Sequence, residues 1–91
     1  MEYSKLSIKN INRISNYIKI KLKNPIAAEN FKINIEKSIY NLSYFTYIGV
    51  KYDKDSDNRF KIYKNFLIFY EIQEKEKIVI IKIIIHKSAN L

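Results

Sequence analysis

The sequence predicts an α+β domain: a short N-terminal strand, a helical hairpin, and then a three-stranded antiparallel meander. Two observations carry this prediction. In the first half of the chain apolar residues recur at three- and four-residue intervals, which is typical of amphipathic helices. Residues 59–87 instead hold alternating and continuous runs rich in β-branched residues, which indicate strands. We expect the helices to cover one face of a small sheet.

Length and composition indicate one small domain, residues 1–91. Apolar residues make up 47% of the chain, an ordinary fraction for a folded globule. The lack of cysteine excludes disulfides, thiolate nucleophiles and cysteine-based zinc sites. The chain begins without an apolar signal segment, and its longest apolar run is too short to span a bilayer. We therefore expect a soluble, cytoplasmic protein with no membrane association.

The net charge of +8 has two explanations. A chain dominated by Ile, Lys, Asn and Tyr is what a very AT-rich genome encodes, so the charge can be a by-product of base composition. Alternatively, it serves an anionic partner, either a nucleic acid or an acidic protein. The basic residues concentrate in residues 1–25 and 59–91, which leaves the middle of the chain nearly neutral.

Two helices are predicted after a short strand near Tyr3. Ser4 is placed to cap a helix from Lys5 to about Leu22, and Asn24-Pro25 supplies a cap and a first-turn proline for a second helix that ends near Leu42. Because one or two residues join them, the helices must form an antiparallel hairpin. The predicted apolar stripes are Ile8, Ile11, Ile14, Ile18 and Leu22 in the first helix, and Ala28, Phe31, Ile35, Ile39 and Leu42 in the second.

A loop over residues 44–58 should precede the strands. Its run from Asp53 to Asn58 resembles the start of a calcium loop, but Asn58 replaces the required glycine and Lys64 the chelating glutamate, which favours a solvated loop. The expected strands are 59–64, 66–73 and 77–87. Strict alternation in the last strand places Val79, Ile81, Ile83 and Ile85 on the face toward the helices, and Lys82 and His86 on the open face.

This order of elements and its particular motifs resemble the RelE/ParE superfamily of bacterial toxins from type II toxin–antitoxin systems. Each motif is weak alone, but their order and spacing are specific, and together they cover nearly the whole chain. The motifs are Ser4-Lys5 with Ile14 and Tyr17-Ile18, the run Asn24-Pro25-Ile26-Ala27-Ala28-Glu29, the spacing of Ile35, Ser38-Ile39 and Leu42, Arg59, the run Asn65-Phe66-Leu67-Ile68-Phe69-Tyr70, and the stretch from Val79 to His86.

The chain departs from the family pattern at several positions, and the departures from RelE-type nucleases favour the ParE-like branch. Lys82 stands where the family has a strand arginine, and Ala89 stands where an arginine is expected after the histidine. Leu67 occupies the position of an arginine in the second strand of RelE-type nucleases, and their C-terminal tyrosine is missing. The leading strand is also short. We hypothesise that Ala89 is a detoxifying change, which an Ala89→Arg variant with no gain in growth arrest would contradict.

If the resemblance extends to RNA cleavage, the chemistry needs a base, an acid and cations for the charged phosphorane. Alternation groups Arg59, a phosphate clamp, with Lys61 and Tyr63 on one face of the first strand of the meander. A register that aligns this face with Lys82 and His86 gives a cationic concave site; the alternative is a solvated sheet face. The candidate site residues are Arg59, Lys61, Tyr63, Lys82, His86 and Lys87. No metal or other cofactor is expected.

The resemblance implies a toxin that inhibits growth, of a kind linked to plasmid stabilization, and that forms a hetero-oligomer with a co-encoded antitoxin. An antitoxin would cover the apolar strands, and an acidic antitoxin tail would complement the net charge. The first choice of target is DNA gyrase. The alternatives are a ribosome-dependent mRNA endonuclease and a non-toxic antitoxin-binding module, toward which the short leading strand and Ala89 point.

Overall fold

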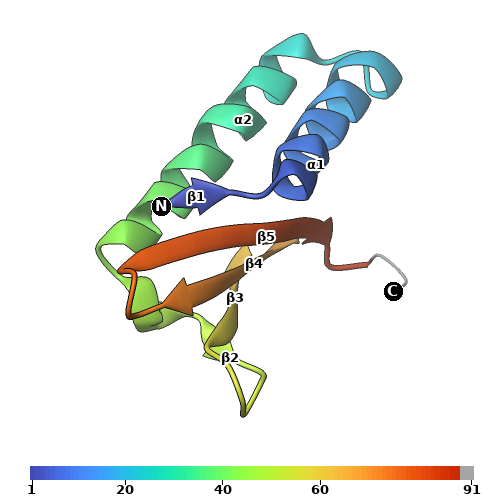
Figure 1. The fold of residues 1–91 in the computed structure, drawn as a ribbon. Helices are drawn as coiled ribbons and strands as arrows, with labels where there is room; N and C mark the ends of the chain where they lie inside the picture. The colour runs from blue at the N-terminus through green and yellow to red at the C-terminus, as the bar shows by residue number, and fades with distance from the viewer. Residues whose placement is uncertain (89–91) are drawn as a thin grey trace.

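The computed structural model describes residues 1–88 and has the predicted α+β architecture. The two helices form an antiparallel pair beside β5 on one side of a twisted sheet, whose β2 end projects away from them (Figure 1). The elements are β1 (Glu2–Tyr3), α1 (Lys5–Asn16), a π-helical turn (Tyr17–Lys21), α2 (Pro25–Tyr40), 3-10 turns (Asn41–Ser43 and Thr46–Ile48), β2 (Val50–Lys51), β3 (Asn58–Tyr63), β4 (Phe66–Gln73) and β5 (Ile78–His86).

Both predicted helix starts are confirmed by their caps. The Ser4 hydroxyl oxygen accepts a hydrogen bond of 3.0 Å from the backbone N–H of Ser7. Asn24 Oδ1 accepts one of 3.0 Å from the N–H of Ala27, with Pro25 in the first turn. The local signals therefore fix where each helix begins, and α2 ends within three residues of the predicted position.

The core forms between α2 and the helix-facing side of the sheet. The predicted stripe of α2 is fully buried, with Ile35, Ile39 and Leu42 completely shielded from solvent. Across from it lie Ile68 and Tyr70 of β4 and the β5 side chains Ile81 and Ile84. These residues hold the helical hairpin on the sheet.

In the first helical segment, which consists of α1 and the π-helical turn after it, the predicted apolar stripe is wrong at both ends. Ile8 and Leu22 are 48% and 57% exposed, whereas Ser7 and Asn10 are buried. The reason is that α1 covers the outer edge of β5, where a strand has unpaired backbone groups. Asn10 Oδ1 accepts a hydrogen bond of 2.9 Å from the N–H of Ile84, so a polar side chain is required at this buried position.

The sheet has five strands in the order β1-β5-β4-β3-β2. The predicted meander forms its antiparallel centre, and β1 adds to β5 in parallel, pairing Tyr3 with Ile81. The additional strand, β2, pairs with the start of β3 and lies inside the stretch predicted to be a loop. Its two residues are too few to produce a detectable alternation.

A β-bulge at Lys82 overturns the predicted faces of β5. Tyr70 pairs with Ile81 and Phe69 with Ile83, so Lys82 is an extra residue without a partner on β4. Beyond the bulge the alternation is inverted: Ile84 and His86 lie on the helix-facing side, and Ile83 and Ile85 on the opposite side. His86 and Lys82 are thus on different faces.

Candidate functional site

The sheet face opposite the helices, which we call the open face, is apolar rather than cationic. The tilted rings of Phe60 and Phe69 pack against each other at 5.8 Å between centroids, and Tyr52 packs against both. The neighbouring Ile62 is 53% exposed. The open face is made by Tyr52, Phe60, Ile62, Leu67, Phe69, Ile80, Ile83 and Ile85, with Asn58, Glu71 and Lys82 beside them. Most of these apolar side chains are half-buried, although no helix covers this side of the sheet.

Arg59 holds the loop between α2 and β3 in place. Its Nε donates a hydrogen bond of 2.8 Å to Asp57, and its Nη1 donates to the carbonyl oxygens of Tyr47 and Gly49 at 3.0 Å each. The guanidinium also lies 5.2 Å from the centre of the Tyr47 ring. With these partners, Arg59 has few donors left for a phosphate.

Lys61 and Tyr63 lie on the helix-facing side of β3. Lys61 Nζ donates a hydrogen bond of 2.8 Å to the carbonyl oxygen of Ser38 near the end of α2. Burial lowers the pKa of Lys61, because a shielded ammonium loses hydration. Tyr63 packs against the core. Lys61 therefore satisfies a backbone carbonyl in the last part of α2.

Lys82 projects from the bulge on the open face. Its Nζ lies 3.5 Å from Asn58 Oδ1, and its own carbonyl oxygen accepts a 2.7 Å hydrogen bond from the Ser4 hydroxyl. The backbone of Lys82 thus joins the start of α1 to β5, while the ammonium group is exposed beside the open face.

His86 ends β5 on the helix-facing side. Its ring meets the Phe66 ring edge-on at 5.3 Å. His86 Nδ1 accepts a hydrogen bond of 3.1 Å from the N–H of Ser88, so Nε2 carries the proton of the neutral ring. The backbone N–H of Lys87 donates to the carbonyl of Asn65 at 2.7 Å, and its side chain is exposed.

The predicted cationic concave site is therefore not assembled. Tyr63, Phe66 and His86 form one row across three strands, but Arg59 lies in the row of Tyr70 and Ile81, and Lys82 lies on the other face. The bulge is the physical reason, because it separates Lys82 from His86. The catalytic roles of the candidate residues stay predictions, and Ala89 lies outside the described residues.

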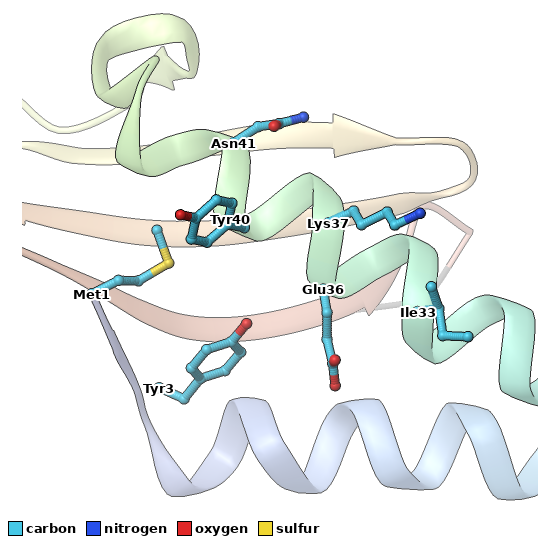
Figure 2. Close-up of a pocket in the computed structure, with 7 residues that line it drawn as sticks. All are labelled: Met1, Tyr3, Ile33, Glu36, Lys37, Tyr40 and Asn41. Atoms are coloured by element: carbon cyan, nitrogen blue, oxygen red, sulfur yellow. The ribbon is translucent and has the colours of Figure 1, made fainter.

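Several hollows flank the helices among the described residues, and two of them have larger volumes than the one between α1 and α2. One, of about 510 Å³, lies between the C-terminal part of the first helical segment and the row that ends in His86. The other, of about 800 Å³, lies between the start of the chain and α2; Figure 2 shows Met1 and Tyr3 with Ile33, Glu36 and Tyr40 around it. Burial, followed by the nearby Glu36 charge, raises the pKa of Tyr3, so its hydroxyl remains protonated at neutral pH.

A comparison with protein-family models finds a match over nearly the whole chain. The model for the ParE toxin of type II toxin–antitoxin systems, parDE, matches residues 1–90. The chain belongs to the ParE toxin family. A search of curated proteins finds no match.

Membership in the ParE toxin family confirms the predicted superfamily and gives the open face a context. ParE-family toxins pair with a cognate antitoxin, and they are the toxin components of their systems. Within residues 1–88, no group of histidine and carboxylate side chains is arranged to hold a metal ion. In the same part of the chain, no helix is long and apolar enough to cross a membrane.

The apolar open face had a detectable signal in the sequence of this ParE family member. In β4 both alternating sets are apolar from Phe66 to Tyr70, which is typical of a strand covered on two sides. The helices cover only one of these sides. The second set, Leu67 and Phe69, is the part of this pattern that could have indicated an apolar surface on the side without helices.

Proposed function

We propose that this chain inhibits growth by binding an essential target, with DNA gyrase as the first choice, and that its cognate antitoxin neutralises it. A binding mechanism is supported by one observation: the side chains that could act as acid, base and cations in RNA cleavage lie apart from one another. Arg59 and Lys61 donate to backbone carbonyls, and Lys82 lies across the sheet from His86. RNA cleavage without a metal needs these groups around one phosphate.

A ribosome-dependent mRNA endonuclease is the second candidate. It is favoured by the row of Tyr63, Phe66 and His86, with Lys64 Nζ 5.7 Å from the centre of the Tyr63 ring and Lys87 next to His86. An exposed histidine beside lysines is a reasonable general acid or base. In this candidate mechanism His86 and Lys87 would act on the RNA, and Arg59 would only hold the loop between α2 and β3 in place.

Expression from a tightly repressed promoter separates the two candidates. A gyrase poison induces the DNA-damage response while mRNA stays intact, and purified gyrase with the toxin accumulates cleaved DNA. A nuclease stops translation rapidly and leaves cut mRNA, and a His86→Ala variant then loses most of that activity. No growth arrest, together with tight antitoxin binding, leaves only a non-toxic antitoxin-binding module.

We also propose that the antitoxin covers the open face. Tyr52 and Ile62 are exposed on this face and its other apolar side chains are half-buried, and apolar sheet surface of this kind aggregates unless a partner covers it. The test compares Ile62→Lys on the open face with Ile26→Lys on α2, since both side chains are exposed, at 53% and 74%. We expect Ile62→Lys to weaken antitoxin binding about tenfold or more, and Ile26→Lys to leave it unchanged. Equal affinities would contradict this docking surface.

A further inference from the structure

The groove of about 510 Å³ beside His86 has an unusual wall. Tyr17 and Leu22 both line it, although residues five apart in an α-helix point to different sides. Here Tyr17 begins a π-helical turn and Leu22 directly follows it, and the N–H of Leu22 donates to the carbonyl of Tyr17 at 3.2 Å. The wider π turn brings positions five apart onto one side, and such turns are frequent at functional sites. The turn therefore builds one wall of the groove.

The opposite wall belongs to the sheet. Phe66 and His86, at the end of the sheet row, face the π turn across the groove. Tyr17 and Leu22 remain 56% and 57% exposed, although both are mainly apolar. The floor includes Ile18, which packs against the core. The hollow is thus of a size and character to receive a large apolar side chain.

The charge of the groove indicates which residue should lie next to the bound apolar side chain. Arg13 lines the groove, and within residues 1–88 no carboxylate lies within ion-pair distance of it. Acidic residues are also absent from the lining of the groove in that part of the chain. The complementary ligand is an apolar side chain next to a carboxylate, a pattern found in acidic amphipathic segments of proteins.

We infer that this groove is a second antitoxin-docking site, which receives an apolar anchor of the antitoxin while Arg13 pairs with an adjacent carboxylate. The inference rests on the proposed neutralisation by an antitoxin and adds a site to it. Phe66 on the groove side and Leu67 on the open face are consecutive residues of β4. A chain that passes around this end of the β3–β4 hairpin reaches both surfaces.

The test uses two pairs of matched variants of the full chain. Arg13→Glu is compared with Lys9→Glu, which makes the same charge change at an exposed position of α1 outside the groove. Leu22→Ser is compared with Ile20→Ser, whose side chain is 66% exposed and does not line the groove. Affinity for the purified antitoxin is measured by calorimetry, and folding is checked by thermal denaturation.

We expect Arg13→Glu and Leu22→Ser each to weaken antitoxin binding about tenfold, and the two controls to change it less than threefold. In cells, the groove variants should still arrest growth but need more antitoxin for rescue. Groove variants that bind like their controls would overturn the inference while leaving the open face as the antitoxin site. A wild-type chain that does not bind the antitoxin would instead overturn the proposed neutralisation.

Other occupants give different results. If a second copy of this chain fills the groove, wild type should dimerise in sedimentation experiments and Leu22→Ser should not, with antitoxin affinity unchanged. If the cellular target fills it, Arg13→Glu should abolish growth arrest and retain antitoxin binding. Either result overturns the inference.

Discussion

Tyr70 ties the loop after α2 to the centre of the sheet. The side chain is fully buried, and its hydroxyl donates to the carbonyl of Thr46 at 2.8 Å and accepts from the N–H of Gly49 at 2.9 Å. Burial raises the pKa of this phenol, so it remains a donor at neutral pH. A Cβ on Gly49 would collide with the Tyr70 hydroxyl and the Phe60 carbonyl, so only glycine fits beside it.

Removing the Tyr70 hydroxyl should therefore destabilise the fold. Tyr70→Phe leaves two backbone groups without their partner, and we expect the free energy of unfolding to fall by about 1–3 kcal/mol in urea titrations. The control is Tyr44→Phe, because Tyr44 is 69% exposed and should change stability by less than about 0.5 kcal/mol. Equal effects of the two substitutions would contradict the anchoring role.

Asp53 organises the turn between β2 and β3. Hydrogen bonds from the backbone N–H of Asp55, and then from the side chains of Asn58 and Ser56, lower its pKa from 3.8. Since the pKa is lower in the folded state, this carboxylate contributes stability above the unfolded pKa and loses it as the pH falls through the folded one. The same bonds explain why the acidic run forms a closed turn.

The pH dependence of stability tests this. Wild type should lose stability as the pH falls below about 4, and Asp53→Asn should lose less over the same interval, because asparagine does not titrate. Melting temperatures at pH 7 and pH 3 measure the difference. Asp55→Asn is the control, since its substitution should leave the acid-induced loss intact. If the stability of Asp53→Asn fell with pH as steeply as that of wild type, the stabilising role of the Asp53 carboxylate would be contradicted.

The elements show which parts of a sequence encode structure locally. The start of α2 and its buried stripe were predictable, because capping, proline and a regular apolar period all lie within the segment. In α1, the buried Asn10 was not predictable, since its partner, the N–H of Ile84, is 74 residues away in the chain. The prediction of which β5 side chains lie on each face of the sheet failed for a similar reason. Alternation assumes a continuous ladder, and a bulge is set by the pairing with β4.

The prediction of the candidate site depended on the same assumption of uninterrupted alternation along each strand. Grouping Arg59, Lys61 and Tyr63 on one face was right, because β3 pairs regularly with β4. Placing Lys82 and His86 together was wrong, because the bulge lies between them. The backbone partners of Arg59 and Lys61 come from other segments, so no local pattern predicted them.

A deletion tests the bulge. Because Lys82 has no partner on β4, removing it leaves all other side chains of β5 on their present faces. We expect the Lys82 deletion to fold and unfold cooperatively, with stability lowered by less than about 2 kcal/mol. The control deletes Ile68 from the regular part of β4. The residues on one side of that deletion then shift by one position, so their side chains point to the opposite face of the sheet, which should prevent folding. Circular dichroism and urea titration measure both.

At the scale of the whole molecule, the open face carries few charged side chains. The open face is mainly apolar, while basic side chains line the exposed side of the first helical segment, including Lys5, Lys9 and Lys19. Short-range affinity for an antitoxin should therefore come from apolar burial, while the net charge of +8 acts at longer range, before contact. These two contributions respond differently to salt.

The rate constants of antitoxin binding should show this separation. Raising the salt concentration from about 50 to 500 mM screens the long-range attraction, so we expect the association rate to fall about tenfold and the dissociation rate to change less than twofold. Lys5→Glu with Lys19→Glu halves the net charge of +8 and should reduce the salt dependence of association. Surface plasmon resonance measures both rates. An association rate that ignores salt would mean that the positive charge reflects only the Lys-rich composition of the chain and has no part in capturing the antitoxin.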